Sequence, residues 1–179
     1  MNVSEMAEPV SIQTLLTYLT LISVPVGVFY HIMTLRNTRK NQELQLETRQ
    51  TQLFMEIYKT YASKQFQKDL EQMRYVWEFE GLDDFFYKYG VENNPDDHAI
   101  WDQAVMWHEG LGVLVRKGLI DPDIVDDLMG GHILHFWGRF GKLIQEFREA
   151  VDAPLAWKEI DYLHDTILEI RERKLSSLA

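Results

Sequence analysis

An uncharged stretch near the N-terminus limits the possible folds of this chain more than any other feature: no side chain between Glu8 and Arg36 carries a formal charge at neutral pH. As a helix rising about 1.5 Å per residue, residues 10–35 reach roughly 40 Å, enough to cross a hydrocarbon core of about 30 Å. The apolar side chains would point all round this helix, unlike those of an amphipathic helix on a soluble core. We therefore predict a transmembrane helix over residues 10–35.

A secretory signal peptide is the alternative, because it is also N-terminal and apolar. Signal peptides begin with a basic segment, whereas acidic residues and no Lys or Arg precede this stretch. Arg36, Arg39 and Lys40 follow it at once, and basic residues mark the cytoplasmic end of a membrane helix. We expect residues 1–9 to form a tail outside the cell (inner or plasma) membrane and the C-terminal part to lie in the cytoplasm.

The rest of the sequence predicts an all-α protein, since no stretch shows the sustained alternation of a β-strand. Residues 36–52 are polar and contain neither Gly nor Pro, which predicts a helical stalk that continues the membrane helix. Residues 53–179 carry apolar side chains at helical spacing and form the expected cytoplasmic domain.

Capping residues, prolines and glycines mark the expected helix ends in this domain. The first helix continues the stalk to about Phe79, and a short one follows between Asp83 and Gly90. The later ones run from Asn94 to Gly118, from Asp121 to a break at Gly130-Gly131, from there through Phe147, and from Asp152 onwards.

Composition excludes several classes of function. The chain has 18 Lys and Arg against 28 Asp and Glu, a formal net charge of −10. We expect no nucleic-acid partner, because phosphate neutralisation needs a basic face. The chain has no Cys, which excludes disulfides, thiolate catalysis and cysteine-ligated metals.

A resemblance to a known family rests on residues 107–121, which read Trp-His-Glu-Gly-Leu-Gly-Val-Leu-Val-Arg-Lys-Gly-Leu-Ile-Asp. Leu128-Met-Gly, Phe136-Trp137, Arg148 and Asp161-Tyr-Leu163 add to it. The chain resembles a family of small membrane-anchored helical proteins of bacteria and archaea, the domain of unknown function 4760. The resemblance covers nearly the whole chain. It implies the helical, anchored architecture and no activity.

His132 and His135 are the candidate metal ligands, because their i, i+3 spacing places them on one helical face. A third ligand would come from His108, Glu109 or Asp127. The pair lacks the i, i+4 spacing and the catalytic Glu of a zinc-protease helix, and its neighbours are apolar. We favour a structural role for both histidines, and we expect no metal and no cofactor.

Glu109 lies within the segment that carries the family resemblance. A carboxylate on an otherwise apolar face can be a general base, but a half-buried Glu paired with Arg116 or Arg148 is the more common arrangement, and we favour it. Gly110 and Gly112 follow helical spacing with no strand before them, so they predict close helix packing instead of a phosphate-binding loop.

A polar seam follows the predicted membrane helix and stalk. Alternating steps of four and three residues from Gln13 meet polar uncharged residues or Gly at every position except Val24. The seam residues are Thr17, Thr20, Gly27, His31, Thr34, Thr38, Asn41, Gln45, Thr48 and Gln52. Helices in a left-handed bundle present such a 3.5-residue repeat to one another. The seam predicts self-association, with His31 near the cytoplasmic interface.

Three functions fit these features. The first is a single-pass protein in the lipid membrane that presents an acidic helical interaction or scaffold domain, as a homo-oligomer or within a larger membrane complex. The second is an oligomeric channel or membrane effector lined by the seam. The third is a membrane-tethered, metal-dependent enzyme. We expect the first, and no enzymatic activity.

Overall fold

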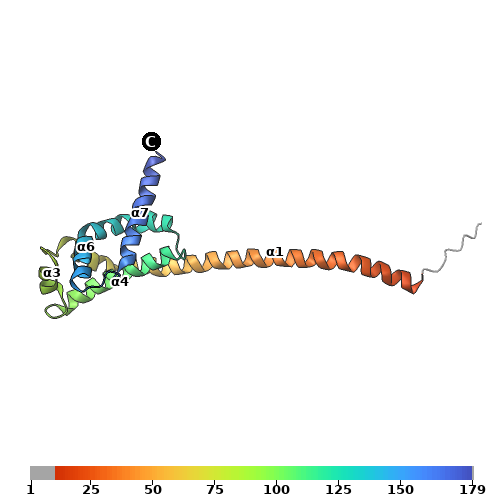
Figure 1. The fold of residues 1–179 in the computed structure, drawn as a ribbon, viewed down its shortest axis with the longest axis horizontal. Coiled ribbons are helices and arrows are strands. Elements are labelled where there is room, and N and C mark those ends of the chain that lie inside the picture. The colour runs from red at the N-terminus through yellow and green to blue at the C-terminus, as the bar shows by residue number, and fades with distance from the viewer. Residues whose placement is uncertain (1–10, 179) are drawn as a thin grey trace, which may run out of the picture. The chain divides into compact units, whose positions relative to one another are not determined.

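The computed structural model describes residues 11–178 and is all-α over that range, which confirms the predicted fold class. Its elements are α1 (Ile12–Tyr61), α2 (Lys64–Tyr75), α3 (Leu82–Tyr89), α4 (Pro95–Arg116), α5 (Pro122–Val125), the π-helical turn η1 (Asp126–Gly130), α6 (Gly131–Ala150) and α7 (Lys158–Ser176) (Figure 1). The chain divides into two compact units, one up to Arg49 and one from Gln50 onwards. We call the second unit the helical domain.

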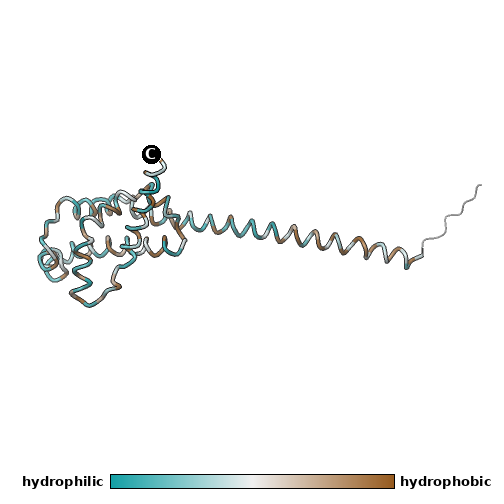
Figure 2. The backbone as a smooth tube through the Cα atoms, turned by 45° about the horizontal axis from the view of Figure 1, so that its top comes forward, coloured by the Kyte–Doolittle hydropathy of each residue, from teal (hydrophilic) through white to brown (hydrophobic). Residues whose placement is uncertain are grey.

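α1 is one continuous helix that contains Pro25. Every residue from 11 to 49 is exposed except the half-buried Gly27. The N-terminal part of α1 is long and apolar enough to cross a membrane, and Figure 2 shows a more polar stretch after it. The tail expected over residues 1–9 lies outside the described residues.

The helix expected to reach Phe79 is interrupted, because α1 ends at Tyr61 and α2 begins at Lys64. Ser63 has an extended backbone, and its hydroxyl oxygen accepts a hydrogen bond from the N–H of Phe66. This is an N-cap. The spacing of apolar residues does not reveal this helix break, because apolar side chains continue at helical intervals on both sides of the cap.

Two other helices confirm the predicted capping signals. The side chain of Asn94 accepts a hydrogen bond from the N–H of Asp97, and Pro95 occupies the first turn of α4. α3 ends at Tyr89, directly before Gly90. At the start of α4, proline is favoured because an N–H group there would have no partner within the helix.

The predicted break at Gly130-Gly131 is wrong, since the chain passes from α5 through η1 into α6 without leaving helical geometry. A Cβ added to Gly130 would lie 2.3 Å from Oδ1 of Asp126. The same Oδ1 accepts a hydrogen bond from Nε of Arg171 at 2.6 Å. Gly130 therefore leaves room for an ion pair instead of making a turn.

α7 begins at Lys158, later than the start predicted near residue 152. The residue before it, Trp157, has a φ of +53°, a left-handed conformation that bulky residues rarely adopt. Arg148 holds this turn: its Nε donates to the carbonyl of Ala156, and its Nη2 donates to the carbonyl of Trp157.

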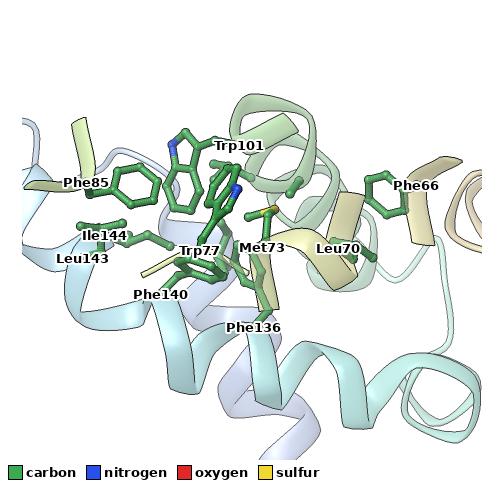
Figure 3. Close-up of a cluster of buried hydrophobic side chains, with 13 residues drawn as sticks. Phe66, Leu70, Met73, Trp77, Phe85, Trp101, Phe136, Phe140, Leu143 and Ile144 are labelled. Carbon is green, nitrogen blue, oxygen red and sulfur yellow. The ribbon is translucent and has the colours of Figure 1, made fainter. Parts of the chain in front are cut away.

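Two clusters of buried side chains form the core of the helical domain. Figure 3 shows the first, which is rich in aromatic rings from α2, α3, α4 and α6, with Trp77 beside them. The second lies mainly between α4, α5, α6 and α7. Its residues are Phe54, Leu111, Val115, Ile120, Val125, Met129, Ile133, Leu163 and Ile167. The apolar side chains that recur at helical spacing in residues 53–179 thus supply the first cluster.

Candidate functional site

Glu109 on α4 contacts the first turn of α7. Its Oε2 accepts hydrogen bonds from the backbone N–H groups of Glu159 at 2.9 Å and Ile160 at 3.1 Å. α7 has no side-chain cap of its own, so Glu109 caps it from another helix. Burial raises the pKa of Glu109, and the two backbone hydrogen bonds oppose that shift.

The ion pair predicted for Glu109 is wrong, because each candidate arginine pairs with a different carboxylate. Nε of Arg116 lies 2.6 Å from Oε2 of Glu159, and Nη1 of Arg148 lies 2.7 Å from Oδ2 of Asp161. Among residues 11–178, no basic side chain forms a salt bridge with Glu109. Its contacts with two backbone N–H groups give Glu109 a structural role.

Close helix packing explains Gly112 but not Gly110. A Cβ added to Gly112 would lie 2.2 Å from the carbonyl oxygen of Glu159, whereas a Cβ on Gly110 meets nothing within 4 Å. We call the contacts of Glu109, Gly112 and Arg116 with the start of α7 the α4–α7 junction. Residues 107–121, which carry the family resemblance, therefore supply the contacts between α4 and the start of α7.

The acidic side chains of α5 and η1 also serve the fold. Oδ1 of Asp121 accepts a hydrogen bond from the N–H of Asp123 and caps α5, as predicted. Asp123 pairs with Arg173 at 2.9 Å, and Asp126 pairs with Arg171. These ion pairs tie α5 and η1 to the C-terminal part of α7.

The structure does not bring His132 and His135 together into a metal site. His132 stacks on His108 with 5.2 Å between ring centroids, whereas His135 is exposed and lines a cavity with Arg74. Within residues 11–178 there is no group of three or more His, Asp or Glu side chains placed to hold a metal. The third ligands considered from sequence are therefore not assembled around this pair.

His108, which is buried, and His132, which is half-buried, form a stacked histidine pair. Nδ1 of His108 lies 2.7 Å from the carbonyl oxygen of Ala104, and its ring stacks on Phe136 at 3.8 Å. Nε2 of each histidine is buried without a hydrogen-bond partner in the described part of the chain. Burial lowers the pKa of His108 to about 3 and that of His132 to about 4. Both rings are therefore neutral near pH 7.

An open cavity of about 760 Å³ lies between the end of α2 and α6. Its lining residues are Arg74, Tyr75, Glu78, Phe79, Leu134, His135, Gly138 and Arg139. We call it the arginine cavity. Partial burial and the charges of Arg74 and Arg139 lower the pKa of His135. Sequence reasoning missed this cavity, because its two arginines lie far apart in the chain and belong to no motif.

The seam residues from Thr17 to Thr48 lie on α1, and all of them are exposed except the half-buried Gly27. The hydroxyl groups of Thr17, Thr20, Thr34 and Thr48 each donate to the carbonyl four residues earlier at 2.8 Å. These hydroxyls are thus satisfied within the helix, and hydrogen bonds to another copy are left to Asn41, Gln45 and His31. Self-association through the seam stays a prediction.

The model of the family described as Domain of unknown function (DUF4760) matches residues 21–167. The match covers most of the chain, which therefore belongs to this family, and this confirms the family to which residues 107–121 pointed. No curated protein and no solved structure matches the chain.

Proposed function

We propose that this member of the DUF4760 family is a single-pass membrane protein that presents its acidic helical domain as a cytoplasmic interaction module. One observation carries the proposal: every described residue in the apolar part of α1 is exposed except the half-buried Gly27. A continuous apolar surface of this size is unfavourable in water. A bilayer core covers such a helix on all sides, and the apolar part of α1 is long enough to cross it.

The orientation follows from charge. Arg36, Arg39 and Lys40 follow the apolar part of α1, and no basic residue precedes it in this sequence. Because positive residues stay on the cytoplasmic side during insertion, the helical domain lies in the cytoplasm and the N-terminus outside.

A thiol-labelling experiment tests this topology. Because the chain has no Cys, Ser4→Cys and Ser177→Cys each introduce a single reporter. An impermeant maleimide added to intact cells is expected to label Ser4→Cys only, and both variants should react after the cells are opened. Labelling of Ser177→Cys alone would reverse the proposed orientation, and recovery of the chain in the soluble fraction would rule out the anchor.

The arrangement of the polar groups supports an interaction module over an enzyme. Glu109 caps α7, and the carboxylates of Asp123 and Asp126 are held in ion pairs. Each of these carboxylates binds an N–H group or an arginine of α7 and so stabilises helix packing. This use favours a structural role for them over that of a catalytic acid or base. The domain then acts through its surface, as a scaffold for further copies or for a larger membrane complex.

Self-association through the seam is the second part of the proposal. A Cβ on Gly27 would meet nothing within 4 Å, so a neighbouring helix can approach its backbone closely, as small residues permit in membranes. Beyond the bilayer, Asn41 and Gln45 offer side-chain amides that can pair with those of another copy. The seam thereby combines close contact in lipid with hydrogen bonding in the stalk.

Disulfide crosslinking in native membranes tests the seam. Single substitutions Asn41→Cys, Gln45→Cys and Thr48→Cys are expected to give crosslinked dimers on mild oxidation, because a shared helix face brings identical positions together. Glu43→Cys and Leu46→Cys lie on other faces of the same helix and should give several-fold less dimer. Equal crosslinking at all five positions would contradict the seam. Ion conductance of the purified chain in planar bilayers would favour the channel over the scaffold.

A further inference from the structure

The arginine cavity holds two positive charges that the fold leaves unpaired. Four arginines of the helical domain pair with carboxylates: Arg116, Arg148, Arg171 and Arg173. Arg74 and Arg139 form no ion pair with any described carboxylate. Both line the same cavity, in a chain whose net charge is −10. A cation pair of this kind in an acidic protein is suited to an anionic ligand.

The fold holds Arg139 in position. Its Nε donates to the carbonyl of Met73 at 3.1 Å, and its Nη2 donates to the carbonyl of Trp77. Its guanidinium lies 5.5 Å from the ring centroid of Phe79. Neutral carbonyls and an aromatic face fix this guanidinium without cancelling its charge. The side chain of Arg139 therefore loses little conformational entropy when a ligand binds.

Arg74 approaches the cavity from α2. Its Nη1 lies 3.3 Å from the hydroxyl oxygen of Tyr75, and its guanidinium lies 5.5 Å from the same ring. Arg74 is half-buried, while Tyr75 is exposed. Together with the imidazole of His135, the two guanidinium groups provide several N–H donors to one volume.

Gly138 supplies an observation independent of charge. It lies inside α6, where glycine is less stable than alanine by about 0.5–1 kcal/mol. A Cβ added there would meet nothing within 4 Å, so contacts within the chain do not require glycine. Gly138 does line the arginine cavity. A side chain at this position would enter space that a ligand could otherwise fill.

We propose that the arginine cavity binds the phosphate group of a small phosphorylated organic molecule. A phosphate group can accept hydrogen bonds from two guanidinium groups at once, and the charged lining of Arg74, Arg139 and Glu78 has a net positive charge that favours it. The cavity, at about 760 Å³, is of the size of ordinary ligand pockets and leaves room for an organic part beside Tyr75 and Leu134. That part belongs either to a soluble nucleotide-like molecule or to a lipid headgroup. The site does not depend on the proposed membrane topology.

Calorimetric titration of the full chain in neutral detergent micelles tests the proposal. The probes are adenosine 5′-monophosphate and dihexanoyl phosphatidic acid, with uncharged adenosine for comparison. At least one phosphate probe is expected to bind where adenosine does not. Preference for the nucleotide would identify a soluble ligand, and preference for the lipid would identify a headgroup. Lack of saturable binding of both phosphate probes at millimolar concentration would overturn the proposal.

Two variants of the cavity and two matched controls test whether binding depends on the cavity itself. Arg74→Gln removes one unpaired charge, and Gly138→Leu fills the cavity, so each is expected to weaken binding about 10-fold or more. Lys158→Gln removes an exposed charge elsewhere, and Gly110→Leu places the same side chain on an open face of α4. Both controls should bind as the unsubstituted chain does. Equal losses in a variant and its control would overturn the proposal.

His135 gives a second readout that does not depend on affinity alone. The charged groups that face it in the cavity are Arg74, Arg139 and Glu78, and the two arginines contribute to lowering its pKa. A bound phosphate would offset their charge. The NMR titration of the His135 ring is therefore expected to move to higher pH when the probe is saturating. An unchanged titration at saturation would place the ligand elsewhere.

Discussion

Replacing Gly112 by alanine is expected to destabilise the helical domain by about 3 kcal/mol, the upper part of the usual range for overpacking. The added Cβ would lie 2.2 Å from the carbonyl oxygen and 2.8 Å from the carbonyl carbon of Glu159. These are backbone atoms of α7, so no side-chain rotation can relieve the clash. Moving α7 away would also stretch the hydrogen bonds of Glu109 and the ion pair of Arg116.

Urea unfolding of the full chain in neutral micelles measures this change. Tryptophan fluorescence reports on the helical domain alone, because all five tryptophans lie between Trp77 and Trp157. Gly110→Ala is the matched control, two residues away on the same helix. Its Cβ meets nothing within 4 Å, so it should stabilise by about 0.5–1 kcal/mol. Equal stability of the two variants would mean that α4 and α7 do not meet at Gly112.

The helix boundaries show which structural signals are local in the sequence. Asn94 with Pro95 and Asp121 with Pro122 begin helices where the sequence predicts them, because a cap and its partner lie within one turn. Ser63 is also a local cap. It was hidden because the apolar spacing that usually dominates helix prediction continues across it.

The site could not be predicted to the same extent, because its contacts join distant segments. The carboxylate of Glu109 meets N–H groups fifty residues later in the chain, and no local pattern relates a glutamate to the start of a helix that far away. Arg74 and Arg139 are a similar case, since only the crossing of α2 and α6 places them in one cavity. Spacing also misled the metal hypothesis: His132 and His135 are close in sequence but face different surroundings.

The stacked histidine pair of His108 and His132 leads to the second large expected effect, a loss of stability in mild acid. In the folded domain the pKa is about 3 for His108 and about 4 for His132, mainly because burial disfavours the charged ring. The coulombic effect of His132 contributes for His108, and those of Arg74 and His135 contribute for His132. An unfolded histidine has a pKa of about 6.5. Below that pH the unfolded chain therefore binds protons that the folded chain does not.

The sign of the effect follows from this difference. Stability from the pair is fully present above about pH 6.5 and falls with decreasing pH until the folded pKa values near 4 and 3 are reached. Each histidine costs about 1.4 kcal/mol per pH unit in this window, so the unfolding free energy should drop by about 4 kcal/mol between pH 7 and pH 5. Glu109 has a pKa raised above its ordinary value of 4.5 by burial, so its protonation stabilises the fold as the pH falls through its folded pKa towards 4.5, which opposes the histidine effect.

Urea unfolding at pH 7, 6 and 5 measures this slope, and two sets of variants assign it. The double variant His108→Met with His132→Gln lacks both imidazoles of the stacked pair and should lose only a minor part of the 4 kcal/mol, even though its stability at pH 7 is lower. His135→Gln removes an exposed ring from the same helix and should retain most of the slope. A double variant as sensitive to acid as the unsubstituted chain would show that other groups take up the protons.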